Sequence, residues 1–185
     1  IAYVRIEDFK RTTAEDLAEE LERLEGEGMR SLVLDLRGNP GGLLSASKEM
    51  CELFLPKNTL VTYTQGRTQP DGTINENQKL YTERNPVVPE TFPVVLLTNE
   101  HTASSSEIVT GALQFYKRAL VVGEKTYGKG SVQTIIELNL PQADPDKAPR
   151  KSALRLTTAL YYTPAEITIN KAGIKPDVDV PMSEK

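Results

Sequence analysis

The sequence predicts a single α/β domain built on a mostly parallel sheet with helical cover, to which the last part of the chain adds antiparallel strands. Up to Gly123, segments with strand-like apolar patterning alternate with segments of helical periodicity, the order typical of βαβ units. From Ser131 on, strand-like segments follow one another without an intervening helix. The length of 185 residues fits one domain over 1–185 with a substantial core.

The individual elements are assigned from apolar periodicity and from the residues that begin or end helices. Strands are expected over residues 1–9, 29–36, 59–65, 92–99, 118–123, 131–138 and 152–162. Helices are expected over residues 12–28, 43–55 and 106–116.

Three local features refine this assignment. Thr13 is expected to cap the first helix, with Asp16 at the capping-box spacing. The continuous apolar run of 92–99 predicts a strand that is buried on both faces. The polar stretches 66–92 and 139–151, rich in residues that favour turns, predict a loop or irregular cover and a surface excursion.

Composition excludes several classes of function. A net charge of −4 gives no electrostatic footprint for nucleic acid, and no apolar run approaches the roughly 20 residues that span a bilayer. Cys51 and His101 are the only residues of their kinds, so a thiolate–imidazole metal site is not expected. The setting of Cys51 in "SKEMCELFL" favours packing on a helix over a reactive thiol. The opening "IAYVRI", without an initiator Met, is interpreted as the start of a piece excised from a longer protein.

Three separated segments could carry chemistry. "TASSSE", residues 102–107, falls where a strand meets a helix, so a Ser hydroxyl could reach a substrate beside free backbone N–H groups; helix capping is the alternative. "YGKGSVQ", 127–133, could bring a Lys between two glycines close to another segment, or could be a hairpin turn. "RGNPGG", 37–42, follows a buried strand, at the end where ligands approach open α/β sheets, although a plain turn also explains it.

A serine nucleophile needs a base, and the sequence offers two. His101 lies on the same short loop as Ser104, whereas a Ser–His pair needs the imidazole to approach from another segment with a carboxylate behind it. Lys129 could act instead if burial disfavours its charge. Bringing a Lys pKa from about 10.4 to about 7–8 corresponds to roughly 4 kcal/mol, which the apolar strands around Lys129 are expected to supply. Gln133 shares a face with Lys129 if the strand is regular.

Taken together, these segments resemble the C-terminal processing peptidases, also called tail-specific proteases. The resemblance covers nearly the whole chain through six ordered motifs, "YVRIEDF", "LVLDLRGNPGG", "VVLLTNEHTASSSEIVTGALQ", "RALVVGEKTYGKGSVQ", "LRLTTALYYTP" and "GIKPDVDV". It implies a Clp protease/crotonase-like fold and a serine endopeptidase with no cofactor. A binding domain on the same fold and an esterase are the rival functions.

The resemblance also implies roles for particular residues. The family's nucleophile is the serine two residues before a Ser-Glu pair, here Ser104, and its general base is here Lys129, oriented by Gln133. The family's oxyanion hole uses a backbone N–H from the "NPGG" turn, Gly41 or Gly42, and the N–H after the nucleophile, here Ser105. Departures from the family pattern occur at His101, Thr102 and Ser105, where small residues are usual.

The expected substrates are proteins or peptides, bound extended and cleaved in their C-terminal regions. Family members carry a PDZ domain and an N-terminal segment ahead of "YVRI", so this chain is expected to fold but to cleave poorly, with Ser104 and Lys129 loosely set. The resemblance implies an extracytoplasmic bacterial setting. It is compatible with membrane association through those preceding segments and with homo-oligomers, and nucleic acid is not an expected partner.

Overall fold

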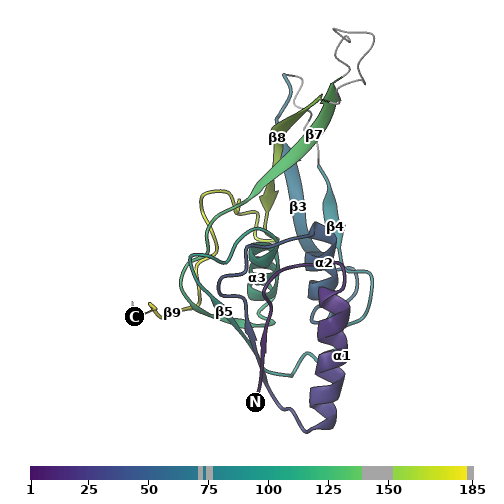
Figure 1. Cartoon of the computed structure of the whole chain (residues 1–185), viewed down its shortest axis with the longest axis vertical. Helices are drawn as coiled ribbons and strands as arrows, with labels where there is room; N and C mark the ends of the chain where they lie inside the picture. Colours follow the sequence, from purple (N-terminus) through teal and green to yellow (C-terminus); the bar gives the residue numbers. More distant parts are fainter. Residues whose placement is uncertain (71–72, 74–76, 139–151, 183–185) are drawn as a thin grey trace, which may run out of the picture.

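The computed structural model describes residues 1–70, 73, 77–138 and 152–182, which form two sheets and three helices (Figure 1). The first sheet is parallel throughout, with strand order β1-β2-β5-β6-β9. Its strands are β1 (Ala2–Arg5), β2 (Leu32–Asp35), β5 (Val94–Thr98), β6 (Leu120–Gly123) and β9 (Val178–Asp179).

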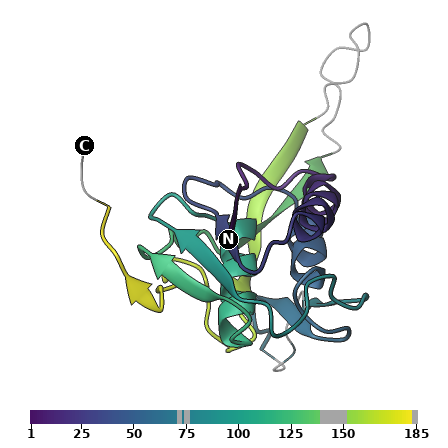
Figure 2. The same cartoon turned by 90° about the horizontal axis from the view of Figure 1, so that it is seen from below.

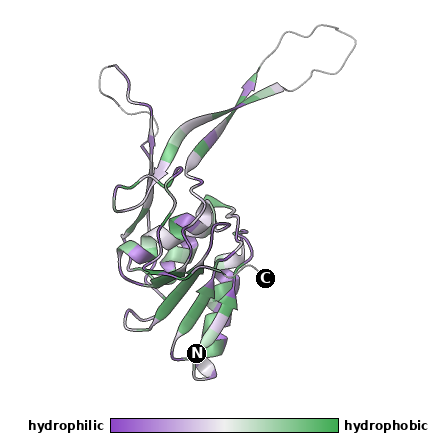
Figure 3. Cartoon of the chain, turned by 90° about the vertical axis from the view of Figure 1, so that its left-hand side faces the viewer, coloured by the Kyte–Doolittle hydropathy of each residue, from purple (hydrophilic) through white to green (hydrophobic). Residues whose placement is uncertain are grey.

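The second sheet is antiparallel and has the strand order β4-β3-β8-β7. Its strands are β3 (Leu60–Gly66), β4 (Lys79–Tyr81), β7 (Ser131–Leu138) and β8 (Ser152–Tyr162). Only the last residues of β8 pair with β3, so the rest of the β7–β8 ribbon projects from the body of the molecule (Figures 1 and 3). All seven strands expected from the sequence are present and the late strands are antiparallel as predicted, but β3 belongs to this second sheet and not to the parallel one.

The helices are α1 (Thr13–Gly26), α2 (Leu44–Glu52) and α3 (Ser105–Phe115). Helices α2 and α3 lie beside each other between the two sheets, and α1 packs against α2 on the outside (Figures 1 and 2). The core that they close contains fully buried Phe9, Leu34, Phe54 and Leu96, and in Figure 3 the parallel strands are mainly hydrophobic. Cys51 lies in this core, and burial raises the pKa of its thiol, which confirms a packing role.

Several expectations need correction. Strand β4 falls within 66–92, which was predicted to be irregular, and the short β9 was not assigned from sequence. Strand β5 is not buried on both faces: Val95 and Leu97 are only half-buried, because the helices cover one face more completely. Thr13 does not cap α1. It is the first helical residue, and its hydroxyl accepts a hydrogen bond from the Lys10 N–H at 2.9 Å. The excursion predicted at 139–151 lies outside the described residues.

Candidate active site

Ser104 occupies a sharp turn between β5 and α3. Its backbone has φ 59° and ψ −120°, a region that non-glycine residues adopt at a cost of about 1–3 kcal/mol. An N-cap residue normally has extended backbone angles, so capping alone does not account for this conformation. A strained Ser on a strand-to-helix turn is instead typical of an exposed nucleophile. Ser104 is half-buried, at the start of the buried first turn of α3.

The turn is held against the "RGNPGG" segment by Asn39, which is fully buried. The Asn39 carbonyl accepts hydrogen bonds from the Ala103 N–H at 2.9 Å and from the Ser106 hydroxyl at 3.2 Å. Gly41, with φ 97°, lies so close that a Cβ on it would come within 2.7 Å of the Ser104 Cβ. Gly41 is therefore required by close approach as well as by its backbone angle. The structure thus brings together two segments that the sequence placed at one site.

The sequence left open whether Gly41 or Gly42 would donate its N–H to the oxyanion hole, and the orientation of the two N–H groups differs. The Gly41 N–H donates to Asn39 Oδ1 at 2.9 Å. Gly42 pairs with Phe9 in a parallel bridge whose hydrogen bonds are made by its neighbours, so the N–H and C=O of Gly42 face away from Phe9. The Gly42 carbonyl accepts the Ser105 hydroxyl at 3.0 Å. The Gly42 N–H therefore points to the side of the nucleophile turn, which favours it over Gly41 as an oxyanion donor.

A buried carboxylate, Glu107, joins the Ser104 turn to the segment that holds Lys129. Its Oε2 atom accepts the Ser104 N–H at 2.8 Å and the Lys129 N–H at 2.8 Å. Its Oε1 atom accepts the Gly128 N–H at 2.7 Å and the Thr126 hydroxyl at 2.6 Å. Glu107 has no exposed surface, so these four donors replace the water that the charge has lost. One side chain thereby fixes both candidate catalytic backbones.

The segment around Lys129 is not the hairpin turn that was the simpler interpretation. It leaves the parallel sheet after β6 and enters the antiparallel sheet at β7, so it connects two sheets. Gly128 has φ 91°, and a Cβ on Gly130 would come within 2.3 Å of the Asn170 backbone nitrogen. Both glycines are therefore needed to lay the chain between Glu107 and the 169–173 loop.

The side chains of Lys129 and Gln133 are less enclosed than expected. Both residues are exposed, and no residue of β7 is fully buried, so the described residues do not provide the burial of Lys129 that the sequence predicted. Lys129 precedes the first residue of β7, and the register shift between Val132 and Gln133 places the extra residue, Thr158, on β8. Within the described residues no hydrogen bond joins the Lys129 amine to the Ser104 hydroxyl; the contacts of these two residues to Glu107 are made by their backbone N–H groups.

His101 lies apart from this arrangement. Its side chain is 70% exposed, with its imidazole 3.6 Å from the carboxylate of the adjacent, equally exposed Glu100. Its backbone N–H donates to Asn99 Oδ1 at 3.2 Å, which shapes the loop before Ser104. An exposed imidazole on the nucleophile's own loop, without a buried carboxylate behind it, does not have the geometry of a triad base.

A second polar cluster braces the strand that leads to the glycine turn. Buried Asp35, the last residue of β2, accepts hydrogen bonds from Arg37 at 2.9 and 2.7 Å and from the Tyr3 hydroxyl at 2.6 Å. Burial acts to raise the pKa of the Asp35 carboxyl, but these hydrogen bonds outweigh it and hold the pKa below its ordinary value. The cluster thus fixes the carboxyl end of β2, from which the Asn39–Gly42 turn follows.

Sequence reasoning missed the roles of Glu107 and Asn39. Glu107 had a readable signal, because Ser104 and Glu107 have the spacing of a capping box, in which the Glu side chain accepts the N-cap N–H. Its second pair of contacts, to residues 126–129, depends on chain crossing that no local pattern shows. Asn39 had no comparable signal.

The strained Ser turn, the adjoining glycine turn and the Lys-bearing connection between two sheets define a serine-hydrolase-like site on a Clp protease/crotonase-like fold. The profile of peptidase family S41 matches residues 1–180. The chain belongs to peptidase family S41, in the group of C-terminal processing proteases.

Relatives and solved structures agree with this assignment. The chain is 40% identical over 177 residues to the carboxyl-terminal-processing protease of Synechocystis sp., covering 96% of this chain and 37% of the relative. It is 37% identical over 179 residues to the chloroplastic carboxyl-terminal-processing peptidase 3 of Arabidopsis thaliana, covering 95% and 31%. The photosystem II D1 C-terminal processing protease structure superposes with a TM-score of 0.79 at 33% identity, covering 97% of this chain and 42% of that one. The chain thus spans well under half of these proteins.

The described residues were also examined for membrane-spanning helices and for groups of side chains that could hold a metal ion. Among the helices that the structure describes, none is long and apolar enough to cross a membrane. The described residues also contain no group of three or more His, Cys, Asp or Glu side chains arranged to hold a metal ion.

Proposed function

We propose that this chain is the catalytic domain of a serine endopeptidase in which Ser104 is the nucleophile and Lys129 the general base. The observation that supports this best is the Glu107 carboxylate: a single oxygen accepts both the Ser104 N–H and the Lys129 N–H, each at 2.8 Å. The two backbones are therefore held side by side although 25 positions separate them in sequence. A Lys129 side chain that folds back over this contact would reach the Ser104 hydroxyl.

The proposed reaction has two halves. Neutral Lys129 takes the proton of the Ser104 hydroxyl as Oγ attacks the peptide carbonyl carbon, and then gives it to the departing amine. Lys129 next takes a proton from water as the water oxygen attacks the acyl carbon, and returns that proton to Ser104 Oγ as the acyl–Oγ bond breaks and the new carboxyl product leaves. Gln133 orients the Lys129 amine. The oxyanion of each tetrahedral intermediate is bound by the N–H groups of Ser105 and of Gly42, whose orientation is the better of the two glycines.

The proposed substrates are proteins or peptides that bind in an extended conformation and are cleaved in their C-terminal regions. The support is the relatives' description as carboxyl-terminal-processing proteases, at up to 40% identity. No cofactor enters the proposed mechanism. We further propose an extracytoplasmic bacterial location; among the plant relatives, the Arabidopsis enzyme is described as chloroplastic.

Labelling with a serine-reactive fluorophosphonate tests this function. The probe should modify Ser104, as read by mass spectrometry of the digested protein, and the Lys129→Ala variant should react much more slowly. A protein that folds but does not react at Ser104 would instead be a ligand-binding domain on this fold. A panel of matched peptide and ester substrates separates the peptidase from an esterase, because only a peptidase would turn over the peptides at a comparable rate.

A further inference from the structure

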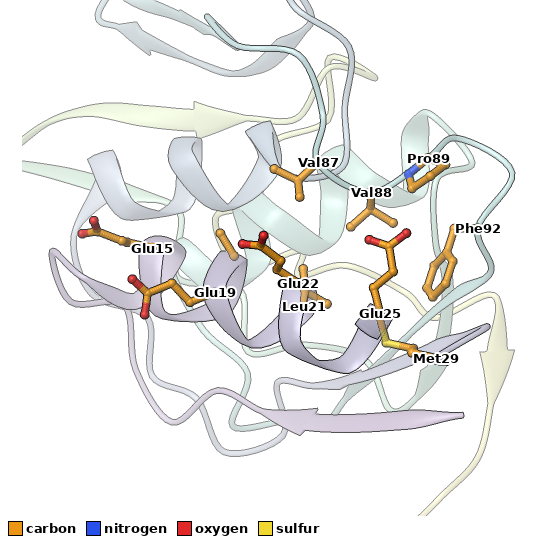
Figure 4. Close-up of a pocket in the computed structure, with 11 residues that line it drawn as sticks. Glu15, Glu19, Leu21, Glu22, Glu25, Met29, Val87, Val88, Pro89 and Phe92 are labelled. Atoms are coloured by element: carbon orange, nitrogen blue, oxygen red, sulfur yellow. The ribbon is translucent and has the colours of Figure 1, made fainter. Parts of the chain in front are cut away.

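A groove on the outer side of the molecule is separate from the candidate active site and shares no residue with it. It lies between α1 and the segment 87–92, encloses about 470 Å³ and has an apolar floor that includes Leu21, Val88 and Phe92 (Figure 4). Leu21 and Val88 are buried core residues, whereas Val87 at the rim is 51% exposed. A hollow of this size with an apolar floor suits one or two large apolar side chains.

One wall of the groove is a row of acidic side chains. It consists of four glutamates of α1, which are spaced three or four residues apart and therefore lie along one helix face: Glu15, Glu19, Glu22 and Glu25. Like charges at this spacing repel each other. None of the four forms an ion pair among the described residues, whereas Glu20 of α1 and Glu27, which follows the helix, both pair with Arg23. Of the residues that the structure describes, no Lys or Arg lines the groove.

The opposite wall is held rigidly by a buried cation. The Arg118 guanidinium donates to the carbonyls of Phe92 at 2.8 Å, Pro89 at 3.0 Å and Phe54 at 3.1 Å. These hydrogen bonds all go to backbone oxygens, and among the described residues Arg118 forms no ion pair with the α1 glutamates. The segment 89–92 is thereby fixed before any ligand arrives, which lowers the entropic cost of binding.

We propose that this groove is a docking site for a basic amphipathic segment of a partner protein. An apolar side chain of the partner fills the hollow over Leu21, Val88 and Phe92, and flanking Lys or Arg side chains lie over the α1 glutamates. Charge complementarity selects this occupant: the row is acidic and unpaired, so anionic membrane surfaces and acidic segments are repelled. Arg11 and Arg84 line the adjoining hollow beyond Glu15, so the basic segment sits toward the Glu19–Glu25 end.

The test uses fluorescence anisotropy with a labelled synthetic peptide in which leucines recur at helical spacing and lysines fill the other positions. A second peptide with Glu in place of Lys is the chemical control. The Glu19→Gln/Glu22→Gln double variant should weaken binding of the Lys peptide about 3- to 10-fold at low salt, and Val87→Ser should weaken it by a similar factor. The matched control is Glu7→Gln/Glu137→Gln, which removes the same charge from exposed positions outside the groove.

Docking at the groove and its alternatives predict different binding results. Specific docking predicts binding of the Lys peptide but not the Glu peptide, and losses confined to the groove variants. Equal losses in the Glu7/Glu137 control would show attraction to net charge alone and would overturn the proposal. Absence of binding to the unmodified chain, or binding that ignores Val87→Ser, would overturn it as well. Light scattering that reveals a dimer dispersed by the Glu19/Glu22 variant would assign the groove to a second copy of the chain, also against the proposal.

Discussion

The Glu107 carboxylate offers the sharpest perturbation of the site, because Glu107→Gln changes one buried oxygen to an NH₂ group without changing size. The amide must turn its NH₂ toward one of the two donor pairs. Turning the NH₂ toward Thr126 and Gly128 costs less, because there one backbone N–H loses its partner, whereas the other side has two. The Thr126 hydroxyl, which also accepts the Ile174 N–H at 2.7 Å, must then turn its hydrogen away from residue 107. One unpaired buried donor costs about 1–3 kcal/mol, so the free energy of unfolding should fall by about that amount.

The same substitution should slow chemistry more than it weakens substrate binding. Losing the Gly128 contact lets the Lys129 segment shift relative to Ser104, and a displacement of about 1 Å can cost on the order of 10²-fold in rate. The measurements are urea unfolding and the fluorophosphonate labelling rate of Ser104, with kcat and KM determined separately on a peptide. Thr110→Val is the matched control, because it removes one buried hydrogen bond of the same helix, to the Ser106 carbonyl at 2.7 Å. The reasoning fails if both variants lose stability and both keep the labelling rate.

Three further perturbations have defined outcomes. Gly41→Ala should abolish Ser104 labelling, since its Cβ would lie 2.7 Å from the Ser104 Cβ; labelling at the unmodified rate would mean that the close approach is not needed. Asp35→Asn should cost about 1–3 kcal/mol at neutral pH. Because the folded pKa of Asp35 is lowered, its stabilisation is present above about pH 4 and is lost as pH falls, so unfolding curves of the two forms should converge in acid, and a constant gap down to pH ~2 would contradict this. Lys129→Arg should not cleave peptides at any pH at which the fold survives, because a guanidinium stays protonated; measurable turnover would remove Lys129 as the base.

The sequence predicted most elements because helical and strand periodicity are local properties. The patterns at 131–138 and 152–162 coincide with β7 and β8, and three helices were placed within a few residues of their observed ends. The antiparallel arrangement of the late strands was also predicted correctly, but β3 was expected in the parallel sheet and pairs instead with β4 and β8, because its partner β8 lies about a hundred residues further along the chain.

The candidate site was partly readable for a similar reason. The glycine turn and the Ser turn both follow parallel strands of one sheet, so their approach through Gly41 and Ser104 follows from the strand order. The exposure of Lys129, in contrast, could not be predicted from the strand order. The apolar residues before and after Lys129 suggested that it would be buried. Burial depends, however, on which elements pack over a strand, and β7 is an exposed edge strand. The four hydrogen bonds of Glu107 could not be predicted from the sequence, because they join segments that only the fold brings together.

The most direct test of the Ser/Lys account is the cleavage rate of an unfolded protein by the longest available protein that contains this chain, measured for the single variants Ser104→Ala and Lys129→Ala and for the double variant. Since the two residues act as one unit, each single variant should abolish cleavage and the double variant should be no worse, while His101→Ala should keep most of the activity. Loss of activity in His101→Ala as large as in Lys129→Ala, or substantial cleavage by Lys129→Ala, would contradict the assignment.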